Sequence, residues 1–301
     1  MDPETHAGCE DRDFDGRTVV VTGATDGIGR EAALAFGRLG AEVVVVGRDE
    51  TKGRAVLDRF ASYDADAHLF TADFSRLSAV RDLATEIGAE FDALDVLVNN
   101  AGTIFRTETF TPEGFEKTAA VNYLSAYQLT HDLWDSLVTG DGAQVVNVSS
   151  NGHRFAEMDL DAIEHPDDYG AFDAYNRSKL ALLCFSNELA RRTDAVRSNA
   201  LHPGFVPGSG FYRRFPGLFN RLLPLLHYVP RAIIRRPIAT TAEAGGMVLY
   251  TACQDGTGAY YEEFEAVEPS DEAVDEETCE DLWEFTADRL DLDPDWTSGA
   301  R

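Results

Sequence analysis

The sequence predicts an α/β protein whose parallel β-sheet is covered by helices on both faces. Strand-like and helix-like patterns alternate along most of the 301 residues. The strand-like segments are short and almost continuously apolar, as in residues 18–22 and 42–46. The helical segments between them carry one apolar stripe each. Apolar strands joined by helices are typical of a parallel sheet that is buried on both faces.

The elements follow one another in a regular order. Residues 18–22 predict a buried strand, residues 28–39 a helix that Gly40 ends, and residues 42–46 a second buried strand. The same alternation continues along the chain. The further expected strands are 68–71, 94–98, 144–148 and 198–201, and the further expected helices are 51–63, 77–91, 115–137, 172–192 and 242–253. We expect one domain, residues 16–265, with a doubly wound parallel sheet of about seven strands.

Three segments interrupt this alternation. Residues 1–15 are acidic and predict a loose N-terminal tail. Residues 266–301 form an acidic C-terminal extension, in which an amphipathic helix is expected over 277–290. Residues 205–238 contain proline, bulky apolar residues and six arginines, but no acidic residue. We interpret 205–238 as a lid over an apolar substrate, with Phe211, Phe215 and Phe219 as its contacts.

The arginines of this lid have two interpretations. They could form a cationic rim that meets a membrane surface or an anionic group of the substrate. Alternatively, they pair with carboxylates of the protein itself. The sequence leaves both open.

The charge balance excludes one class of function. The chain has 26 basic and 53 acidic residues, a net charge of −27, which argues against nucleic-acid binding because phosphate backbones are held by Lys and Arg. Only Lys52, Lys117 and Lys179 are lysines. This composition is typical of halophilic archaea, where concentrated salt screens a dense acidic surface. An acidic protein from an arginine-biased genome is the alternative.

The cysteines and the N-terminal residues lead us to expect a cytoplasmic location. Cys9, Cys184, Cys253 and Cys279 are widely separated and form no metal-binding spacing, so neither a metal site nor a disulfide framework is expected. The N-terminal residues lack the apolar core of a secretory signal. No apolar run approaches the length of a membrane-spanning helix.

A glycine-rich loop follows the first expected strand. Gly23, Gly27 and Gly29 would let the backbone approach a pyrophosphate at the N-terminus of the next helix, where free N–H groups favour anions. The spacing is GxxxGxG, which differs from the usual dinucleotide fingerprint GxGxxG. A plain tight turn is the alternative, but the position between a buried strand and a helix favours dinucleotide binding.

A second segment carries residues suited to proton transfer. Tyr175 and Lys179 are four residues apart, so both lie on one face of a helix. A phenol ionises near pH ~10, and its use near pH ~7 requires about 4 kcal/mol of stabilisation. The ammonium of Lys179 can supply part of it by favouring the ionised form of Tyr175.

Six motifs in a fixed order give the chain a resemblance to a known family. They are TGATDGIG at 22–29, NNAG at 99–102, VNY at 121–123, VSS at 148–150, YNRSK at 175–179 and HPG at 202–204. In these motifs the chain resembles the classical short-chain dehydrogenases/reductases over residues 16–265. The gap of 25 positions between Ser150 and Tyr175 (175 − 150) is similar to that of the retinol dehydrogenase and WW-domain oxidoreductase group.

The resemblance implies a Rossmann-type fold and four catalytic roles. Tyr175 would donate or accept the proton, and Lys179 would lower its pKa and bind the nicotinamide ribose. Ser150 would orient the substrate oxygen, with Ser149 as its competitor for this role. Asn122 would kink its helix and hold a water that relays protons to Lys179. Hydride transfer creates an alkoxide-like oxygen, which needs such a hydroxyl and a proton.

The resemblance also implies the contacts of the cofactor. Its binding residues would be Gly23, Thr25, Gly27, Ile28, Gly29, Arg48, Asp73, Phe74, Asn100, Ala101, Tyr175, Lys179, Gly204 and Val206. Asp73 would contact the adenine, although a helix N-cap is its alternative role. His202 would support the turn before the cofactor. Ser209 could replace a threonine that the family often carries after this turn.

The choice between NADP and NAD depends on the end of the second strand. An acidic residue there would bind the ribose hydroxyls of NAD, but this chain has Gly47 and Arg48. Arg48 favours NADP, although it could instead pair with Asp49 or Glu50 in a solvated loop. Asp26 opposes NADP because its charge faces the same region.

We therefore expect an NAD(P)-dependent enzyme that interconverts an alcohol and a ketone or aldehyde, with NADP preferred. The expected substrate is an apolar small molecule of retinol-, steroid- or lipid-like character. The alternative is a regulatory or scaffold protein that binds the cofactor without turnover. A peripheral membrane protein anchored by residues 205–238 is a third interpretation. The family resemblance further implies a homo-oligomer.

Overall fold

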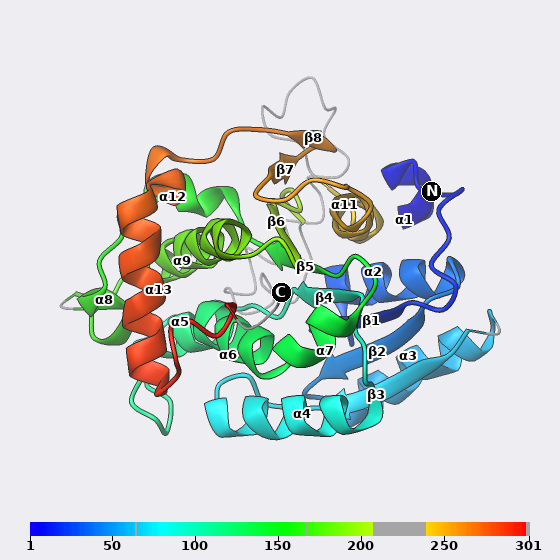
Figure 1. The fold of residues 1–301 in the computed structure, drawn as a ribbon, viewed down its shortest axis with the longest axis horizontal. Coiled ribbons are helices and arrows are strands. Elements are labelled where there is room, and N and C mark those ends of the chain that lie inside the picture. Colours follow the sequence, from blue (N-terminus) through cyan, green and yellow to red (C-terminus); the bar gives the residue numbers. More distant parts are fainter. Residues whose placement is uncertain (64, 167, 207–238, 299–301) are drawn as a thin grey trace, which may run out of the picture.

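The fold is known from a computed structural model, which describes residues 1–63, 65–166, 168–206 and 239–298. In this part of the chain one eight-stranded sheet has the order β3-β2-β1-β4-β5-β6-β7-β8 (Figure 1). The first seven strands are parallel and β8 is antiparallel to β7. The strands are β1 (Thr18–Thr22), β2 (Glu42–Gly47), β3 (Ala67–Thr71), β4 (Val96–Asn99), β5 (Gln144–Val148), β6 (Arg197–Leu201), β7 (Tyr260–Glu262) and β8 (Glu265–Ala266). The predicted Rossmann-type parallel sheet is confirmed.

The helices lie in two layers, one on each face of the sheet (Figure 1). One layer contains α2 (Gly27–Arg38), α3 (Glu50–Ala61) and α11 (Thr241–Ala252). The other contains α4 (Leu77–Glu90), α6 (Ser125–Asp132) and α9 (Ala171–Arg192). The shorter helical elements are α5 (Lys117–Ala119), α7 (Trp134–Thr139), η2 (Asn151–Phe155) and α8 (Asp161–Glu164).

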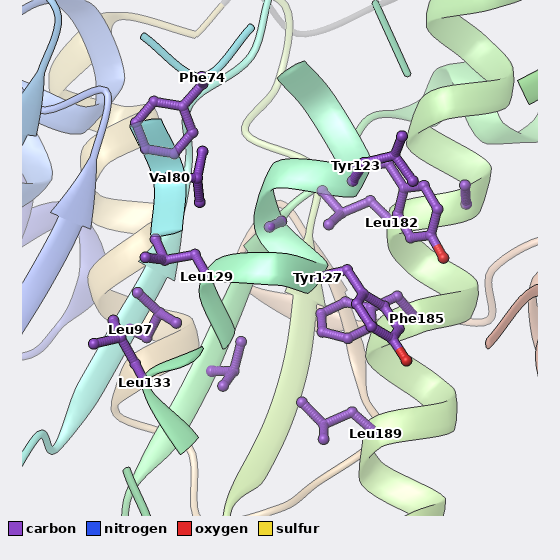
Figure 2. Packing of buried hydrophobic residues seen from close by; sticks show 14 of the residues in the cluster. Phe74, Val80, Leu97, Tyr123, Tyr127, Leu129, Leu133, Leu182, Phe185 and Leu189 are labelled. Carbon is purple, nitrogen blue, oxygen red and sulfur yellow. The ribbon is translucent and has the colours of Figure 1, made fainter. Parts of the chain in front are cut away.

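Neighbouring residues of each strand belong to opposite cores. Val20 and Val44 pack in the layer under α4, α6 and α9, whereas Val19 and Val43 pack in the layer under α2 and α11. Figure 2 shows the first core, in which Tyr127 and Phe185 contact each other across α6 and α9. Burial on both faces explains the nearly continuous valine runs of β1 and β2.

The helix predicted over 115–137 is interrupted in the middle. Helices α5 and α6 flank a π-helical segment, η1 (Ala120–Leu124), which contains Asn122. The wider turn places the Asn122 side chain against the loop after β4, where it bonds both backbone groups of Thr103. Single π turns inside helices are frequent at functional sites.

The prediction of a loose N-terminal tail is wrong. Residues Pro3–Ala7 form helix α1, which packs on α11 so closely that a side chain at Gly246 would meet the Pro3 carbonyl at 2.7 Å. Phe14 is buried against Phe36, and Glu4 forms an ion pair with Arg38. These contacts lie far apart in the sequence, so the local composition of the segment did not reveal them.

The C-terminal extension contains the predicted helix and packs on the main domain. It forms α12 (Asp271–Val274) and α13 (Glu276–Leu290), and α13 packs against α9 (Figure 1). Trp283 is buried between Phe185 and Trp296, and its ring is stacked on both. The extension thus completes the core on this face of the sheet.

The predicted lid lies outside the described residues apart from Phe205 and Val206. The residues on either side of 207–238 are joined, because the Ala239 N–H donates to the Phe205 carbonyl at 2.9 Å. The roles predicted for the lid phenylalanines, the lid arginines and Ser209 therefore stay predictions. Within the described ranges, no helix combines the length and the apolar character needed to cross a bilayer.

Candidate active site

The glycine-rich loop connects β1 to α2 by close backbone packing. Gly23 and Gly27 have positive φ angles of 67° and 57°, which disfavour any residue with a side chain. A Cβ at Gly29 would lie 2.4 Å from the Asn100 amide and 2.6 Å from the Gly23 carbonyl. A Cβ at Gly27 would meet no atom within 4 Å, so the backbone borders open space there. The loop leaves room for a ligand beside Gly27, at the N-terminus of α2.

Asn100 and Thr22 hold the ends of β1 and β4 together. The Thr22 hydroxyl accepts hydrogen bonds from the backbone N–H groups of Asn100 and Ala101 at 2.9 and 3.0 Å. The Asn100 amide in turn donates to the Thr22 carbonyl at 2.7 Å. These bonds fix the carboxyl edge of the sheet, where ligands bind in folds of this kind.

The end of β2 carries a cluster of charged side chains. Arg48 is exposed, and among the described residues it forms no ion pair, because Asp49 caps α3 and Glu50 pairs with Arg54 at 2.6 Å. The alternative role of Arg48, pairing with its neighbours in the loop, is thus not observed. The Thr25 side chain lies beside the end of β2, because a Cβ at Gly47 would collide with the Thr25 side chain.

Lys52 is a feature of this cluster that sequence reasoning missed. Its ammonium contacts the Asp26 carboxylate at 2.9 Å, with both side chains partly exposed. Asp26 also accepts from the Gly27 N–H at 2.8 Å and caps α2. The charge that was expected to oppose NADP therefore has a cationic partner. The signal in the sequence was a rare lysine at the start of the second helix.

Asp73 and Phe74 follow β3. The Asp73 carboxylate accepts from the backbone N–H and the hydroxyl of Ser75 at 3.0 and 2.8 Å. Partial burial alone would raise the pKa of Asp73, but these hydrogen bonds and the charges of Lys117 and Arg48 lower it. The N-cap of α4 is Arg76, so the alternative role of Asp73 as this cap is not observed. The Phe74 side chain is buried in the core (Figure 2).

The two candidate serines differ in their surroundings. Ser149 is buried, and its hydroxyl donates to the Lys179 carbonyl at 2.8 Å. Ser150 lies at the wall of a cleft that Tyr175 also lines, and the Ser150 side chain lowers the pKa of the Tyr175 phenol against the effect of burial. The Ser150 oxygen also accepts from the Gly152 N–H at 3.2 Å. The geometry thus brings Ser150, and not Ser149, to the phenol.

Lys179 and Asn122 converge on Gly102. A Cβ at Gly102 would lie 3.3 Å from the Lys179 ammonium and 3.4 Å from the Asn122 carbonyl oxygen. Lys179 is buried and donates to the Val148 carbonyl at 2.7 Å. The Asn122 amide donates to the Ser178 hydroxyl at 2.9 Å. Gly102, Asn122 and Lys179, which lie far apart in the sequence, therefore meet at the carboxyl edge of the sheet.

Burial determines the ionisation of this group. It raises the pKa of the Tyr175 hydroxyl, and the Ser150 side chain opposes this effect. Burial also lowers the pKa of Lys179 to about 8. The expectation that Lys179 lowers the pKa of Tyr175 is not met here, because removal from water disfavours the charged form of both groups.

The site opens into a cleft of about 720 Å³. Ser150, Tyr175 and Lys179 line it together with the predicted cofactor contacts Ile28, Asn100, Gly204 and Val206. Gly204 has a φ of 83°, and a Cβ there would meet Ala239 at 2.8 Å. His202 accepts from the Asn151 N–H at 3.4 Å, consistent with support of the neighbouring turn.

Three phenylalanines give the cleft apolar walls that the sequence did not predict. Phe155 and Phe172 are 68% and 56% exposed although both are large and apolar. Phe264 lies in the turn between β7 and β8, and its ring packs against Tyr250 at a centroid distance of 5.7 Å. Only Phe155 and Phe172 could have been suspected from sequence, since they lie within the segment between Ser150 and Tyr175.

The turn that carries Phe264 has an unfavourable backbone. Glu263 and Phe264 have φ angles of 49° and 65°, and the flanking pair Glu262 and Glu265 closes a two-residue hairpin. Such turns favour Asn-Gly, because left-handed backbone costs other residues about 1–2 kcal/mol each. Strained backbone is found most often where a side chain must be held in one place.

A polar network joins this hairpin to the segment after Ser150. The Glu262 carboxylate accepts from the Asn151 amide at 3.0 Å and contacts the Arg154 guanidinium at 3.4 Å. The Tyr260 hydroxyl donates to the Asn151 carbonyl oxygen at 3.3 Å. The network places a carboxylate and a guanidinium in the cleft wall. Glu262 and Arg154 lie 108 residues apart, which hid their pairing from sequence reasoning.

The fold and the site together define an oxidoreductase that uses a nicotinamide cofactor on an alcohol or carbonyl group. A family model described as short chain dehydrogenase matches residues 17–213. The chain belongs to the short-chain dehydrogenase family.

Two relatives match nearly the whole chain. The human WW domain-containing oxidoreductase is 34% identical over 285 residues, which cover 90% of this chain and 67% of that protein. Human retinol dehydrogenase 13 is 30% identical over 285 residues, which cover 92% of this chain and 86% of that protein. The predicted likeness to this group of the family is confirmed.

Solved structures share the fold. A protein of uncharacterised function from Mycobacterium paratuberculosis has a TM-score of 0.74 at 28% identity, with 93% of this chain and 96% of that chain covered. A protein described as an NAD(P)-dependent gluconate 5-dehydrogenase from Beutenbergia cavernae has a TM-score of 0.64 at 26% identity, with 82% and 95% covered, and its structure contains NADP.

Proposed function

We propose that this enzyme is an NADP-dependent oxidoreductase for an apolar alcohol or carbonyl compound. One observation carries the proposal: Ser150, Tyr175 and Lys179 line the same cleft. A substrate carbonyl oxygen in this cleft could accept from the hydroxyls of Ser150 and Tyr175. Two donors aimed at one oxygen stabilise the charge that develops there during reduction.

The cofactor fits the edge of the sheet described above. Open space beside Gly27, the N-terminus of α2 and the neighbouring Asn100 suit a pyrophosphate and a ribose. When bound, the cofactor supplies or accepts the hydride, and the protein supplies binding, orientation and the proton. Lys179 is the residue suited to contact the nicotinamide ribose.

Proton transfer is assigned to Tyr175. Its hydroxyl gives a proton to the substrate oxygen in reduction and takes it back in oxidation. The Lys179 ammonium, with its pKa of about 8, can replace this proton near neutral pH. Asn122 positions the relay: its carbonyl oxygen accepts from the Thr103 N–H at 2.7 Å and keeps a second acceptor site for a water.

The preference for NADP rests on two cations at the end of β2. Arg48 forms no salt bridge with a described residue and can bind the 2′-phosphate. Lys52 neutralises Asp26, so the repulsion expected from that carboxylate is reduced. We expect Arg48→Asp to shift the preference toward NADH, because the new carboxylate repels the phosphate and accepts from the ribose hydroxyls. Tighter binding of NADH than NADPH by the unaltered enzyme would contradict this assignment.

The apolar substrate is inferred from the walls of the cleft. Exposed Phe155 and Phe172 offer large apolar surface in a space that can hold a retinoid- or steroid-sized molecule. The name of the relative retinol dehydrogenase 13 agrees with such a substrate. Short polar carbonyl compounds should be poor substrates by comparison.

The decisive experiment is a panel of alcohols and carbonyl compounds with NADPH and NADH in molar KCl. Tyr175→Phe should bind NADPH almost normally and lose nearly all turnover, since only the transferred hydroxyl is removed. Tyr169→Phe is the matched control, because the Tyr169 hydroxyl donates to the Phe105 carbonyl outside the described cleft lining. Turnover by Tyr175→Phe at the level of the control would refute the assignment. Cofactor binding without turnover on any substrate would favour the scaffold alternative.

We infer that the enzyme works in the cytoplasm at high salt and as a homo-oligomer. Contact with a membrane would involve residues 205–238, most of which lie outside the described residues. Sedimentation of the enzyme alone in molar KCl tests whether it is a homo-oligomer. Sedimentation with liposomes in the same salt tests whether it contacts a membrane.

A further inference from the structure

The cleft contains a pair of opposite charges that the catalytic roles do not use. Arg154 lies in η2, which follows Ser150 directly, and Glu262 is the last residue of β7. Both line the cleft, and the Arg154 Nη2 lies 3.4 Å from the Glu262 Oε1. Their side chains are 38% and 20% exposed, so a bound molecule can still reach both.

The Glu262 carboxylate has a fixed position in the cleft wall. The Asn151 amide donates to its Oε2 at 3.0 Å. Asn151 is itself held, because its carbonyl oxygen accepts from the Tyr260 hydroxyl at 3.3 Å and its backbone N–H donates to His202 at 3.4 Å. The strand that carries Glu262 is held as well, since the His202 N–H donates to the Tyr261 carbonyl at 2.9 Å.

The strained turn after Glu262 is anchored on α11. The Phe264 N–H donates to the Met247 sulfur at 3.0 Å, and the Phe264 ring packs against Tyr250. The carboxylate therefore depends on α11 as well as on the sheet for its position. A polar group that is held in place before binding costs a ligand less ordering entropy than a mobile one.

The pair keeps unused hydrogen-bonding capacity. The Arg154 Nη2 donates to the Glu268 carbonyl at 2.7 Å, and its Nε and Nη1 have no hydrogen bond to any residue in the described part of the chain. A guanidinium has five N–H donors and a carboxylate has about four acceptor sites. Glu262 uses one site on each oxygen, for Asn151 and for Arg154. A donor and an acceptor thus remain available side by side.

The charges around this pair favour a neutral ligand group. Arg154 and Glu262 compensate each other, so an ionised group would meet a like charge in one of the two. A carboxylate would also meet the repulsion of Glu263, which lines the same cleft. A hydroxyl avoids both penalties, because it can donate to Glu262 and accept from Arg154 at the same time.

We propose that Glu262 and Arg154 determine substrate specificity by binding a second hydroxyl group of the substrate, remote from the alcohol or carbonyl that reacts. This inference rests on the proposed function, since it takes the reacting oxygen to lie at Ser150 and Tyr175. The substrate is then an apolar hydroxy ketone, or the diol that its reduction yields. A site built to pair a hydroxyl rejects an analogue that lacks it, because the polar groups of the site are left without partners.

The test measures the binding of methyl ketones to the enzyme with NADP⁺ by isothermal titration calorimetry in molar KCl. A ketone and the oxidised cofactor cannot react, so binding is measured without turnover. The chain length runs from octan-2-one to tetradecan-2-one, and each ketone is compared with its ω-hydroxy derivative. At the chain length that spans the distance between the two ends of the site, the hydroxy ketone should bind about tenfold more tightly than its parent.

Two variants of the same hairpin sharpen the result. Glu262→Gln should reduce the preference for the hydroxy ketone to about twofold, because a neutral amide is a weaker acceptor than a carboxylate. Glu265→Gln is the matched control and should keep the full preference, since Glu265 pairs with Glu262 across the hairpin but lies outside the described cleft lining. Arg154→Met should reduce the preference as Glu262→Gln does.

Three results would each overturn the inference. They are equal binding of the hydroxy and parent ketones at every chain length, tighter binding of the ω-amino ketone than of the ω-hydroxy ketone, and an equal loss of preference in Glu262→Gln and Glu265→Gln. The wild-type comparison decides the matter even if a variant does not fold. Turnover of the same ketones with NADPH tests the proposed function separately. Turnover without a hydroxyl preference contradicts only the inference, whereas the preference in binding without any turnover contradicts only the proposed function.

Discussion

The buried lysine of the active site should reduce the stability of the fold. Lys179 has a pKa of about 8 in the folded protein, compared with 10.5 for an unperturbed lysine. Between these values the unfolded chain binds more protons than the folded protein, so stability rises as the pH increases from 8 to 10.5. Below pH 8 the full penalty of burying the ammonium is present. Replacing Lys179 by methionine should remove it.

The lowered pKa of Lys179 sets the size of the expected change in the free energy of unfolding. A difference of about 2.5 pKa units corresponds to about 3 kcal/mol, at about 1.36 kcal/mol per unit. The lost hydrogen bond to the Val148 carbonyl, worth about 1 kcal/mol, acts in the opposite direction. We therefore expect Lys179→Met to raise the free energy of unfolding by about 2 kcal/mol at pH 7, while turnover is lost. The melting temperature should rise by about 4–8 °C.

Denaturant unfolding of cofactor-free protein at pH 7 and pH 10, in constant molar KCl, measures this effect. The advantage of Lys179→Met should shrink toward zero, or become slightly negative, at pH 10 because the wild-type lysine is then largely neutral in the folded protein. Lys52→Met is the matched control, since Lys52 is half exposed and its pair with Asp26 is worth at most about 1 kcal/mol. A Lys179→Met protein that is no more stable than wild type at pH 7 would refute the reasoning.

Four further outcomes are expected. Lys52→Ala should weaken NADPH binding by severalfold and NADH binding much less, as measured by fluorescence titration, and equal losses would show that Lys52 does not act through the 2′-phosphate. Glu263→Asn should raise the melting temperature by about 2 °C, because asparagine tolerates left-handed backbone, and unchanged stability would argue against strain in the turn. Trp283→Ala should lower the free energy of unfolding by about 3–5 kcal/mol in denaturant titrations, unless the C-terminal extension is dispensable for folding. Dilution from molar KCl to 0.1 M should unfold the enzyme, since the Debye length grows to about 10 Å, and an unchanged circular dichroism spectrum would contradict this.

The sheet could be predicted because its signal is local. Strands β1, β2 and β4 are short and mainly apolar, and helical patterns separate them along the chain. The strands β7 and β8 have only three and two residues and include charged side chains, so no apolar run marked them. Strand β7 owes its position to pairing with β6, which no local pattern contains.

The catalytic cluster was predicted from spacing and from family resemblance, but its ionisation was not. Tyr175 and Lys179 are neighbours on one helix, which sequence periodicity reveals. The burial that shifts both pKa values comes from segments far along the chain, such as the Val148 carbonyl that Lys179 contacts. The same limit applies to the docking of α1 on α11. Contacts between distant segments carry no signature in a single sequence.

The three glycines of the first loop show how the fold and the candidate cofactor site depend on one another. Gly29 and Gly23 are required by the protein itself, because a Cβ at either would collide with Asn100. Gly27 differs, since open space surrounds it and only its left-handed backbone excludes a side chain. Two of the glycines thus let β1, α2 and the end of β4 approach one another. That approach leaves the backbone at Gly27 facing the space where a pyrophosphate fits, so the packing of the first βα unit creates the proposed binding site.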